Sequence, residues 1–283
     1  MGKIASFCQT RKSLAHNRCM SRTTCTFLLA LALPLAAAAQ TGSSPLPNAP
    51  DANSTQANAP QAAAADDPTL RNLPRNFFHD QAAIWTSPLR LNEHNALGPV
   101  VLVGATTLLM TTDHQVMSKH FLTKSTNDHA NTVSTGMTGL LVAAPAAFFV
   151  AGSMKKNEQA RETGVMAGEA MVDSLAVNEV FKIASRRERP TVDDARGKFF
   201  QPGVNFDSSF ASNHCMVAWS SAAVIASEYN GFLTQVLAYG AATGVSLTRV
   251  AGRDHFPSDV LVGSAVGWMI GRYVYHRHHR YHY

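Results

Sequence analysis

Long stretches rich in alanine, valine and leucine, separated by proline and glycine, fill most of the chain from Leu97 to Tyr275. None of them shows a convincing alternation of apolar and polar residues, which would mark a half-buried β-strand. Breakers divide them into segments of helical length. The sequence therefore predicts an all-α fold, with about six helices over 97–112, 132–154, 162–185, 214–229, 232–249 and 257–275.

The residues before this region have a different composition. Residues 1–39 carry five basic and no acidic residues, an apolar run from Phe27, and a small-residue stretch before Gln40. This pattern is typical of a signal peptide, and an uncleaved N-terminal anchor is the alternative. Residues 40–68 almost lack large apolar side chains, so we expect a disordered linker. Residues 70–95 hold scattered aromatic residues and prolines, and we expect an irregular segment there.

Charge and cysteine content narrow the class of protein. The leader holds five of the 24 basic residues, which leaves 19 basic and 19 acidic residues in the remainder. The positive net charge thus belongs to the leader and gives no case for nucleic-acid binding. Three of the four cysteines also lie in the leader, so a cleaved chain would keep only Cys215 and no intrachain disulfide.

Two segments, 134–154 and 230–248, are long enough and sufficiently free of charge to span a membrane. Segment 162–185 is interrupted by Glu169, Asp173 and Glu179. We therefore expect a compact exported bundle with buried helices, located in the periplasm. The alternative is an inner-membrane protein whose active site faces the periplasm.

The stretch from Thr248 to Asp259 concentrates side chains suited to catalysis. Pro257 fits the first turn of a helix, which places His255 just before that helix. Asp259 follows within reach of one imidazole nitrogen of His255, leaving the other free as a nucleophile. Arg249 would bind an oxyanion. In isolation, this stretch is equally consistent with a capped helix carrying a surface His–Asp pair.

Two further segments have ordinary explanations when each is taken alone. Lys182 and Arg189 flank the end of the third helix, where Pro190 is expected to stop it and a lysine complements the helix dipole. Ser212 or Asn213 would cap the fourth helix, with His214 in its first turn. Together with the stretch 248–259, however, these two segments give three motifs in a fixed order along the chain.

This set resembles the type 2 phosphatidic acid phosphatase superfamily, which also includes bacterial non-specific acid phosphatases and vanadium-dependent haloperoxidases. The family pattern is Lys-x6-Arg-Pro, Pro-Ser-Gly-His and Ser-Arg-x5-His-x3-Asp. This chain has Lys182…Arg189-Pro190, Ala211-Ser-Asn-His214 and Thr248-Arg249…His255…Asp259. The resemblance spans about residues 97–275 and implies the helical bundle of these enzymes, so we expect a helical phosphatase domain over 69–276.

The combined residues are suited to the hydrolysis of a phosphate or pyrophosphate ester. His255 would attack phosphorus, Asp259 would hold its tautomer, and His214 would protonate the leaving oxygen and then activate water. The resemblance implies the same roles, with a phosphohistidine intermediate and neither a metal ion nor another cofactor. Positive charge and hydrogen-bond donors for the phosphate would come from Lys182, Arg189, Ser212, Asn213 and Arg249.

Three positions depart from the family pattern. Ala211 stands for proline and Thr248 for serine, and we expect both to be tolerated. Asn213 stands for a glycine whose backbone approaches the phosphate. Asparagine accepts positive φ better than other non-glycine residues, so the loop should survive, but its side chain would crowd or re-aim the contact. Because every charged and titrating member is present, we expect retained activity.

Other functions stay open at this stage. The pocket of a vanadate-dependent haloperoxidase would use His255 as a vanadate ligand, with vanadate as cofactor, whereas vanadate would inhibit a phosphatase. A degenerate, non-catalytic envelope protein is the third candidate. We expect the partner to be a phosphorylated small molecule or a lipid phosphate, with membrane association as an option. The predicted His/Arg-rich tail, 277–283, is either a solvated basic end or a chelator of a transition metal.

Overall fold

The fold is described by a computed structural model over residues 70–119, 122–204 and 206–279, which all belong to one compact unit, Gln56–Tyr283. Within these residues the chain forms α-helices joined by loops and two short 3-10 helices, Ser87–Arg90 and Asp193–Ala195, and it has no strand. The all-α prediction is confirmed. The α-helices are α2 (Leu73–Thr86), α3 (Leu97–Ser118), α4 (Lys124–Lys155), α5 (Glu158–Ser185), α6 (Asn213–Glu228), α7 (Phe232–Ala251) and α8 (Pro257–His278). The predicted signal peptide and linker lie outside the described residues.

The six predicted helices correspond to α3–α8, but the expectation of an irregular segment over 70–95 is wrong. Residues 73–86 form α2, which has a proline in its first turn, where the missing N–H costs nothing. The buried residues of α2 are Asn76 and Asp80. The prolines among its scattered aromatic residues favoured an irregular segment in the sequence, although α2 packs Ile84 against the core.

Helix boundaries also differ between the predicted helices 97–112 and 132–154. Helix α3 continues to Ser118, and α4 already begins at Lys124. The Thr123 hydroxyl caps α4 by accepting a hydrogen bond from the Thr126 N–H at 3.3 Å. On its C-terminal side, α8 continues through His278, so the first two residues of the predicted tail, 277–283, belong to this helix.

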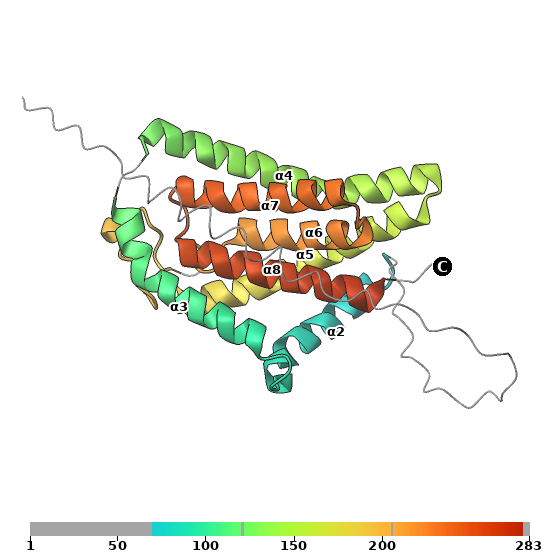
Figure 1. The fold of residues 1–283 in the computed structure, drawn as a ribbon, viewed down its shortest axis with the longest axis horizontal. Coiled ribbons are helices and arrows are strands. Elements are labelled where there is room, and N and C mark those ends of the chain that lie inside the picture. The colour runs from blue at the N-terminus through green and yellow to red at the C-terminus, as the bar shows by residue number, and fades with distance from the viewer. Residues whose placement is uncertain (1–69, 120–121, 205, 280–283) are drawn as a thin grey trace, which may run out of the picture. The chain divides into compact units, whose positions relative to one another are not determined.

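Helix α6 is the centre of the unit and packs against α4, α5, α7 and α8 (Figure 1). Its contact with α8 is close because three glycines of α8, spaced by four residues, face the α6 backbone. A Cβ atom added at Gly263, Gly267 or Gly271 would lie 2.2–2.6 Å from a carbonyl oxygen of α6 or its N-cap. The two backbones therefore touch along their length, which fixes the N-terminal ends of α6 and α8 beside each other.

Pro145 lies inside α4 and is buried there. Because proline has no N–H, the carbonyl of Leu141 loses its usual helical donor. The Ser221 hydroxyl of α6 donates to that carbonyl at 3.1 Å. A side chain of the central helix thus satisfies the group that Pro145 leaves open, and it joins α4 to α6.

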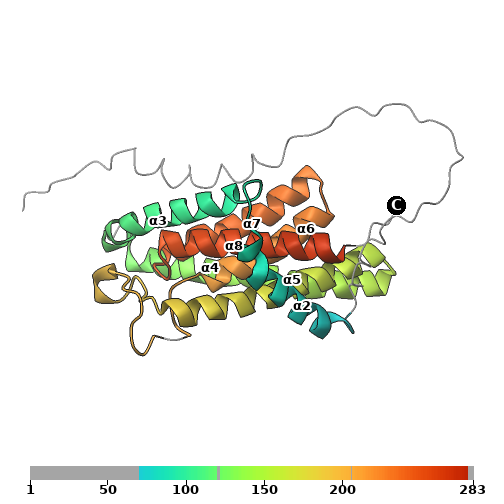
Figure 2. The same cartoon turned by 90° about the horizontal axis from the view of Figure 1, so that it is seen from below.

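The helix ends are distributed between two ends of the unit. The C-terminal end of α5 and the N-terminal ends of α6 and α8 lie at one end, on the left in Figure 1, whereas α2 and the C-terminal end of α8 lie toward the other. Figure 2 shows α8 running between α3 and α5, both of which it contacts. The three segments with predicted catalytic residues therefore meet at one end.

The outward faces of several helices are apolar, contrary to the expectation that these helices are buried. Helix α4 is long and apolar enough to cross a membrane, and only 17% of its most apolar window is buried. No other helix in the described ranges meets this length and hydropathy test, so the predicted candidate 230–248 falls short of it. Exposed large apolar side chains include Leu97, Val100, Val103 and Leu108 of α3, Leu140, Val150 and Met154 of α4, and Phe232, Leu233 and Leu237 of α7.

Candidate active site

Lys182 owes its place to the way α5 ends. The helix stops at Ser185, five residues before Pro190, because Arg186 takes a left-handed conformation with φ of 43°. Its N–H donates to the Lys182 carbonyl at 2.9 Å. Pro190 is therefore not the residue that stops this helix, as the sequence suggested. Lys182 lies in the last turn, is 8% exposed, and donates through Nζ to the Phe206 carbonyl at 3.0 Å.

The loop before α6 is tied to both neighbouring helices. The Asn178 side chain of α5 donates to the Ala211 carbonyl at 3.1 Å, and the Ser212 N–H donates to the Asp259 carbonyl of α8 at 3.2 Å. The Ser209 N–H donates to the Arg187 carbonyl at 2.8 Å. These bonds hold the start of α6 against the start of α8 and the segment after α5.

His255 is 2% exposed and has a defined tautomer. Its Nδ1 lies 2.7 Å from the Ser209 carbonyl oxygen, which can only accept, so Nδ1 carries the proton and Nε2 keeps its lone pair. The sequence assigned this orienting role to Asp259. The expected direct hydrogen bond from His255 to Asp259 is not formed, because the Asp259 carboxylate is 4.0 Å from Nδ1. A backbone carbonyl does the orienting instead.

Asp259 supports His255 through Ser209. One Asp259 oxygen accepts from the Ser209 hydroxyl at 2.5 Å and from the Phe256 N–H at 2.9 Å. The other accepts from Arg187 at 2.5 Å. Burial raises the pKa of Asp259, and the Arg187 guanidinium opposes that rise. One carboxylate therefore binds Ser209 from the loop before α6, Phe256 at the start of α8, and Arg187 after α5.

Arg187 is the residue that sequence reasoning missed. It is 2% exposed, pairs with Asp113 of α3 at 2.8 Å as well as with Asp259, and donates to the Ser258 hydroxyl at 2.8 Å. Its guanidinium also lies over the Phe256 ring, 4.0 Å from the centroid. The only sequence signal was a cluster of three arginines within 186–189. Nothing in that cluster distinguishes a buried arginine from an exposed one.

Two further cations converge on Asp254, the residue before His255. The Arg249 guanidinium of α7 pairs with the Asp254 carboxylate at 2.9 Å, and Arg189 donates to the Asp254 carbonyl at 3.4 Å. Arg249 is 6% exposed, whereas Arg189 is more open and also pairs with Asp207 at 2.9 Å. Arg189 and Arg249 are thus held beside the residue that precedes His255, and each already has a carboxylate partner.

The pKa values of both histidines reflect these cations. Burial, followed by the charges of Arg249, Arg189 and Lys182, lowers the pKa of His214 to about 4. Burial and the charges of Arg249 and Arg189 lower the pKa of His255 well below its usual value. The structure thus brings Lys182, Arg189, His214, Arg249 and His255 into one electrostatic environment, in which both imidazoles are neutral at pH 7 before an anion binds.

Ser212 and Asn213 start α6. Ser212 is the N-cap, yet its hydroxyl makes no capping bond and no hydrogen bond to a described nitrogen or oxygen atom, although it is buried. Asn213 is the first helical residue and does not have positive φ, so no left-handed conformation is required of it. The Ser212 hydroxyl and the first N–H groups of α6 are thus suited to hold an anion.

Comparisons with known proteins agree with this arrangement at the level of the family. The model of the PAP2 superfamily matches residues 163–283, which include all three motifs and confirm the resemblance seen in the sequence. Among solved structures, the chain is similar to a transmembrane PAP2-type phosphatidylglycerolphosphate phosphatase from Bacillus subtilis. The sequence identity is 20% and the TM-score is 0.41, over 74% of this chain and 94% of that chain. The comparison with curated proteins gave no match.

Proposed function

Because residues 163–283 belong to the PAP2 superfamily, we propose that this chain is a phosphatase that hydrolyses phosphate or pyrophosphate esters through a phosphohistidine. The observation that carries the proposal is that half-buried His214 and buried His255, both neutral at pH 7, lie within the electrostatic reach of Arg189 and Arg249. Lys182 also acts on His214. Three cations can compensate the two negative charges of a phosphate monoester and their redistribution onto the leaving and equatorial oxygens in the transition state.

The first chemical step uses the free Nε2 of His255. Its lone pair attacks phosphorus, the bond from phosphorus to the ester oxygen breaks, and the leaving oxygen takes a proton from His214. The imidazole of His255 becomes cationic as the bond forms, and the Ser209 carbonyl, which accepts from Nδ1 at 2.7 Å, stabilises that charge. Asp259 acts as a positioning residue through Ser209.

The second step regenerates the enzyme. His214, now neutral, removes a proton from water, which attacks phosphorus and releases inorganic phosphate and His255. The two steps require opposite protonation states of His214. In the free protein its pKa is about 4, and a bound phosphate dianion raises this pKa because the opposite charge favours imidazolium. Substrate binding therefore favours the protonated form of His214, which is the form that acts as the general acid.

Replacing His214 with alanine should separate the two steps. We expect the first turnover of an alkyl phosphate to slow by about 10²–10⁴-fold, because its leaving oxygen needs the proton. With p-nitrophenyl phosphate, whose leaving group needs no proton, the first turnover should persist and release about one nitrophenol per chain. Rapid-mixing kinetics with both substrates measures this difference.

The exposed His129→Ala variant should behave as wild type in the same assay. Equal loss of the first turnover for both substrates in His214→Ala would argue against a role as general acid. Full steady-state turnover of p-nitrophenyl phosphate by that variant would argue against a role in hydrolysis of the phosphoenzyme.

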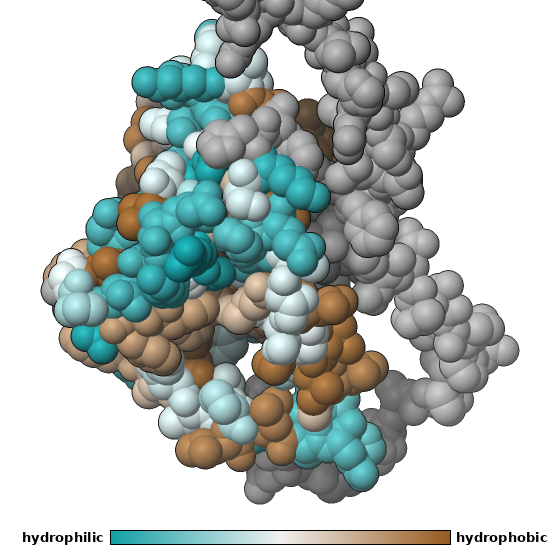
Figure 3. All heavy atoms as spheres, turned by 90° about the vertical axis from the view of Figure 1, so that its left-hand side faces the viewer, coloured by the Kyte–Doolittle hydropathy of each residue, from teal (hydrophilic) through white to brown (hydrophobic). Residues whose placement is uncertain are grey.

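We further propose that the phosphatase is membrane-associated and acts on a lipid phosphate. The support is the apolar outer face of α4 together with the exposed apolar side chains of α3 and α7. Faces of this extent are costly in water and usually mark contact with a membrane or a partner. Figure 3, which views the end with the candidate site, shows hydrophilic side chains gathered across the middle of that face and hydrophobic ones lower down. We propose an exported chain, with this end turned toward the periplasm.

Fractionation tests the association. We expect the chain to sediment with membranes, resist extraction by high salt, and dissolve in detergent. The mass of the recovered chain shows whether residues 1–39 remain. This distinguishes anchoring by the leader from anchoring by the helices. Leu140→Lys on α4, where the native side chain is 74% exposed, should shift a leader-free chain toward the soluble fraction. Recovery of the leader-free wild type without detergent would contradict the proposal.

A further inference from the structure

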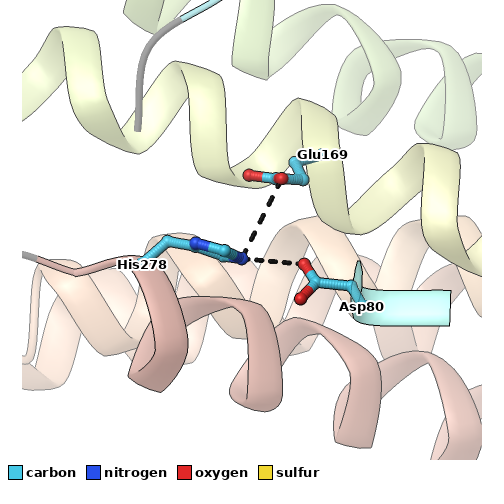
Figure 4. A group of neighbouring side chains, drawn as sticks. All are labelled: Asp80, Glu169 and His278. Atoms are coloured by element: carbon cyan, nitrogen blue, oxygen red, sulfur yellow. Dashed lines mark hydrogen bonds and ion pairs between the residues drawn. The ribbon is translucent and has the colours of Figure 1, made fainter. Parts of the chain in front are cut away.

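A second cluster of titratable side chains lies away from the candidate active site. Asp80 of α2, Glu169 of α5 and His278 of α8 point toward one another (Figure 4). The His278 Nε2 atom is 2.8 Å from an Asp80 oxygen and 3.9 Å from a Glu169 oxygen. The ligand atoms of the three residues all lie within 4.8 Å of one another, and each residue is at most 3% exposed.

The inner face of α2 makes this cluster unusual. The buried residues of α2 are Asn76 and Asp80, which are one helical turn apart on the same face. Asn76 is 1% exposed, and its side-chain oxygen and nitrogen make no hydrogen bond to any described residue. Burying an amide and a carboxylate costs free energy unless other groups compensate. Apolar contacts hold the C-terminal part of α2, where Ile84 packs against the core and Trp85 meets Phe181. They leave the buried side-chain amide of Asn76 without a hydrogen bond to any described residue.

Asp173 adds a further carboxylate. It follows Glu169 by one turn of α5, is fully buried, and lies close enough to Asp80, Glu169 and His278 to interact with their charges. One of its oxygens accepts from Gln81 of α2 at 2.9 Å, and the other has no hydrogen-bond partner among the described residues. Three acidic side chains and one imidazole are thus buried together, and a bound cation would offset part of the cost of burying their charge.

We propose that Asp80, Glu169 and His278 bind one divalent transition-metal ion, such as Zn²⁺, that fastens α2 to α5 and α8. Zn²⁺ binds histidine nitrogen and carboxylate oxygen at about 2.0–2.2 Å, so tetrahedral ligands lie about 3.3–3.6 Å apart. The observed separations of 2.8 and 3.9 Å bracket that spacing. The imidazole disfavours Mg²⁺ and Ca²⁺, which prefer oxygen ligands.

The surroundings fit a structural site. The Tyr273 hydroxyl donates to the second Asp80 oxygen at 3.1 Å, as outer hydrogen bonds do around metal-bound carboxylates. Glu169 lies about 20 Å along α5 from Lys182, and His278 lies about 28 Å along α8 from Asp259. The ion would therefore join three helices without touching the phosphate chemistry. His278 also differs from the solvated tail that the sequence suggested, because its side chain is buried.

The test measures metal content and thermal unfolding of the full chain in detergent. After exchange against Zn²⁺ and removal of excess metal, we expect about one ion per chain by elemental analysis. At a Zn²⁺ concentration of about 100 times Kd, the ion should raise Tm by about 5–10 °C over the EDTA-treated protein. Phosphatase activity well below Tm should not change with EDTA.

Asp80→Asn and His278→Gln should each lose the bound ion and the Zn²⁺-dependent rise in Tm. Two exposed residues serve as matched controls: His276→Gln, on α8 near the cluster, and Asp128→Asn, in the first turns of α4 and away from it, should keep both. A wild-type chain with no bound ion and no Tm response would overturn the proposal and leave a protonated His278 paired with the carboxylates. Loss of the ion from His276→Gln, but not from His278→Gln, would assign the metal to the exposed end of the chain instead.

Discussion

Replacing His255 with alanine should reduce phosphatase turnover by at least about 10³-fold while leaving the helical content unchanged. The imidazole Nε2 is the only nucleophile in the proposed mechanism. The alanine variant keeps Arg189 and Arg249 beside Asp254, which we propose bind the anion. Phosphate or vanadate should therefore still bind. Turnover of an alkyl phosphate, together with inhibitor binding measured by calorimetry, checks both halves of this expectation.

A covalent label makes the test specific to the nucleophile. In the His214→Ala background, radiolabelled p-nitrophenyl phosphate should leave an acid-labile, base-stable label on the chain, and adding His255→Ala should abolish it. The exposed His94→Ala variant is the matched control and should keep turnover and label. Activity that survives His255→Ala would remove this histidine as nucleophile. Labelling of another residue would leave the phosphatase in place but reject the phosphohistidine.

Replacing Arg187 with methionine should lower the free energy of unfolding by about 3–5 kcal/mol and also abolish turnover. The substitution leaves the buried carboxylates of Asp113 and Asp259 without their shared cation, and both are at most 2% exposed. Asp259 would then lose its fixed position, and with it the hold on Ser209 and His255. Chemical denaturation followed by circular dichroism measures the loss of stability.

Arg187→Lys separates charge from geometry. It restores one positive charge, but an ammonium group cannot span the two carboxylates as the guanidinium does, so we expect stability between wild type and Arg187→Met with turnover still reduced. The neighbouring Arg186→Met is the matched control, because Arg186 is partly exposed and lies outside the network. If the denaturation midpoint of Arg187→Met equals that of the wild type, the ion pairs of Arg187 with Asp113 and Asp259 do not stabilise the site.

The sequence was sufficient to identify the resemblance to the PAP2 superfamily. It was also sufficient to identify the motif residues that we propose act on the phosphate. Lys182, His214, Arg249 and His255 occur in motifs with fixed spacing, and each spacing reflects the end of a helix. Sequence reasoning can locate such ends, because proline, small polar residues and the change in apolar pattern mark them locally. The structure brings these residues to one end of the unit, as the motifs suggested.

The contacts that orient those residues were not available from the sequence. The partner of His255 Nδ1 is the Ser209 carbonyl and not Asp259. A backbone carbonyl has no signature in a sequence, since every residue carries one. Arg187 and Asp113, which are 74 residues apart, likewise form an ion pair that no local pattern encodes.

The sequence by itself determined an all-α fold and the order of six of its helices, and it supplied the side chains that we propose act on a phosphate. Apolar periodicity and helix-end residues are local properties of the chain. Only the tertiary structure decided how these parts support one another. It revealed α2, whose inner face is polar, buried Arg187 between two carboxylates, and assembled Asp80, Glu169 and His278 from helices nearly two hundred residues apart. Each of these depends on desolvation by neighbours distant in the chain, and burial of that kind is created by packing and not by sequence spacing.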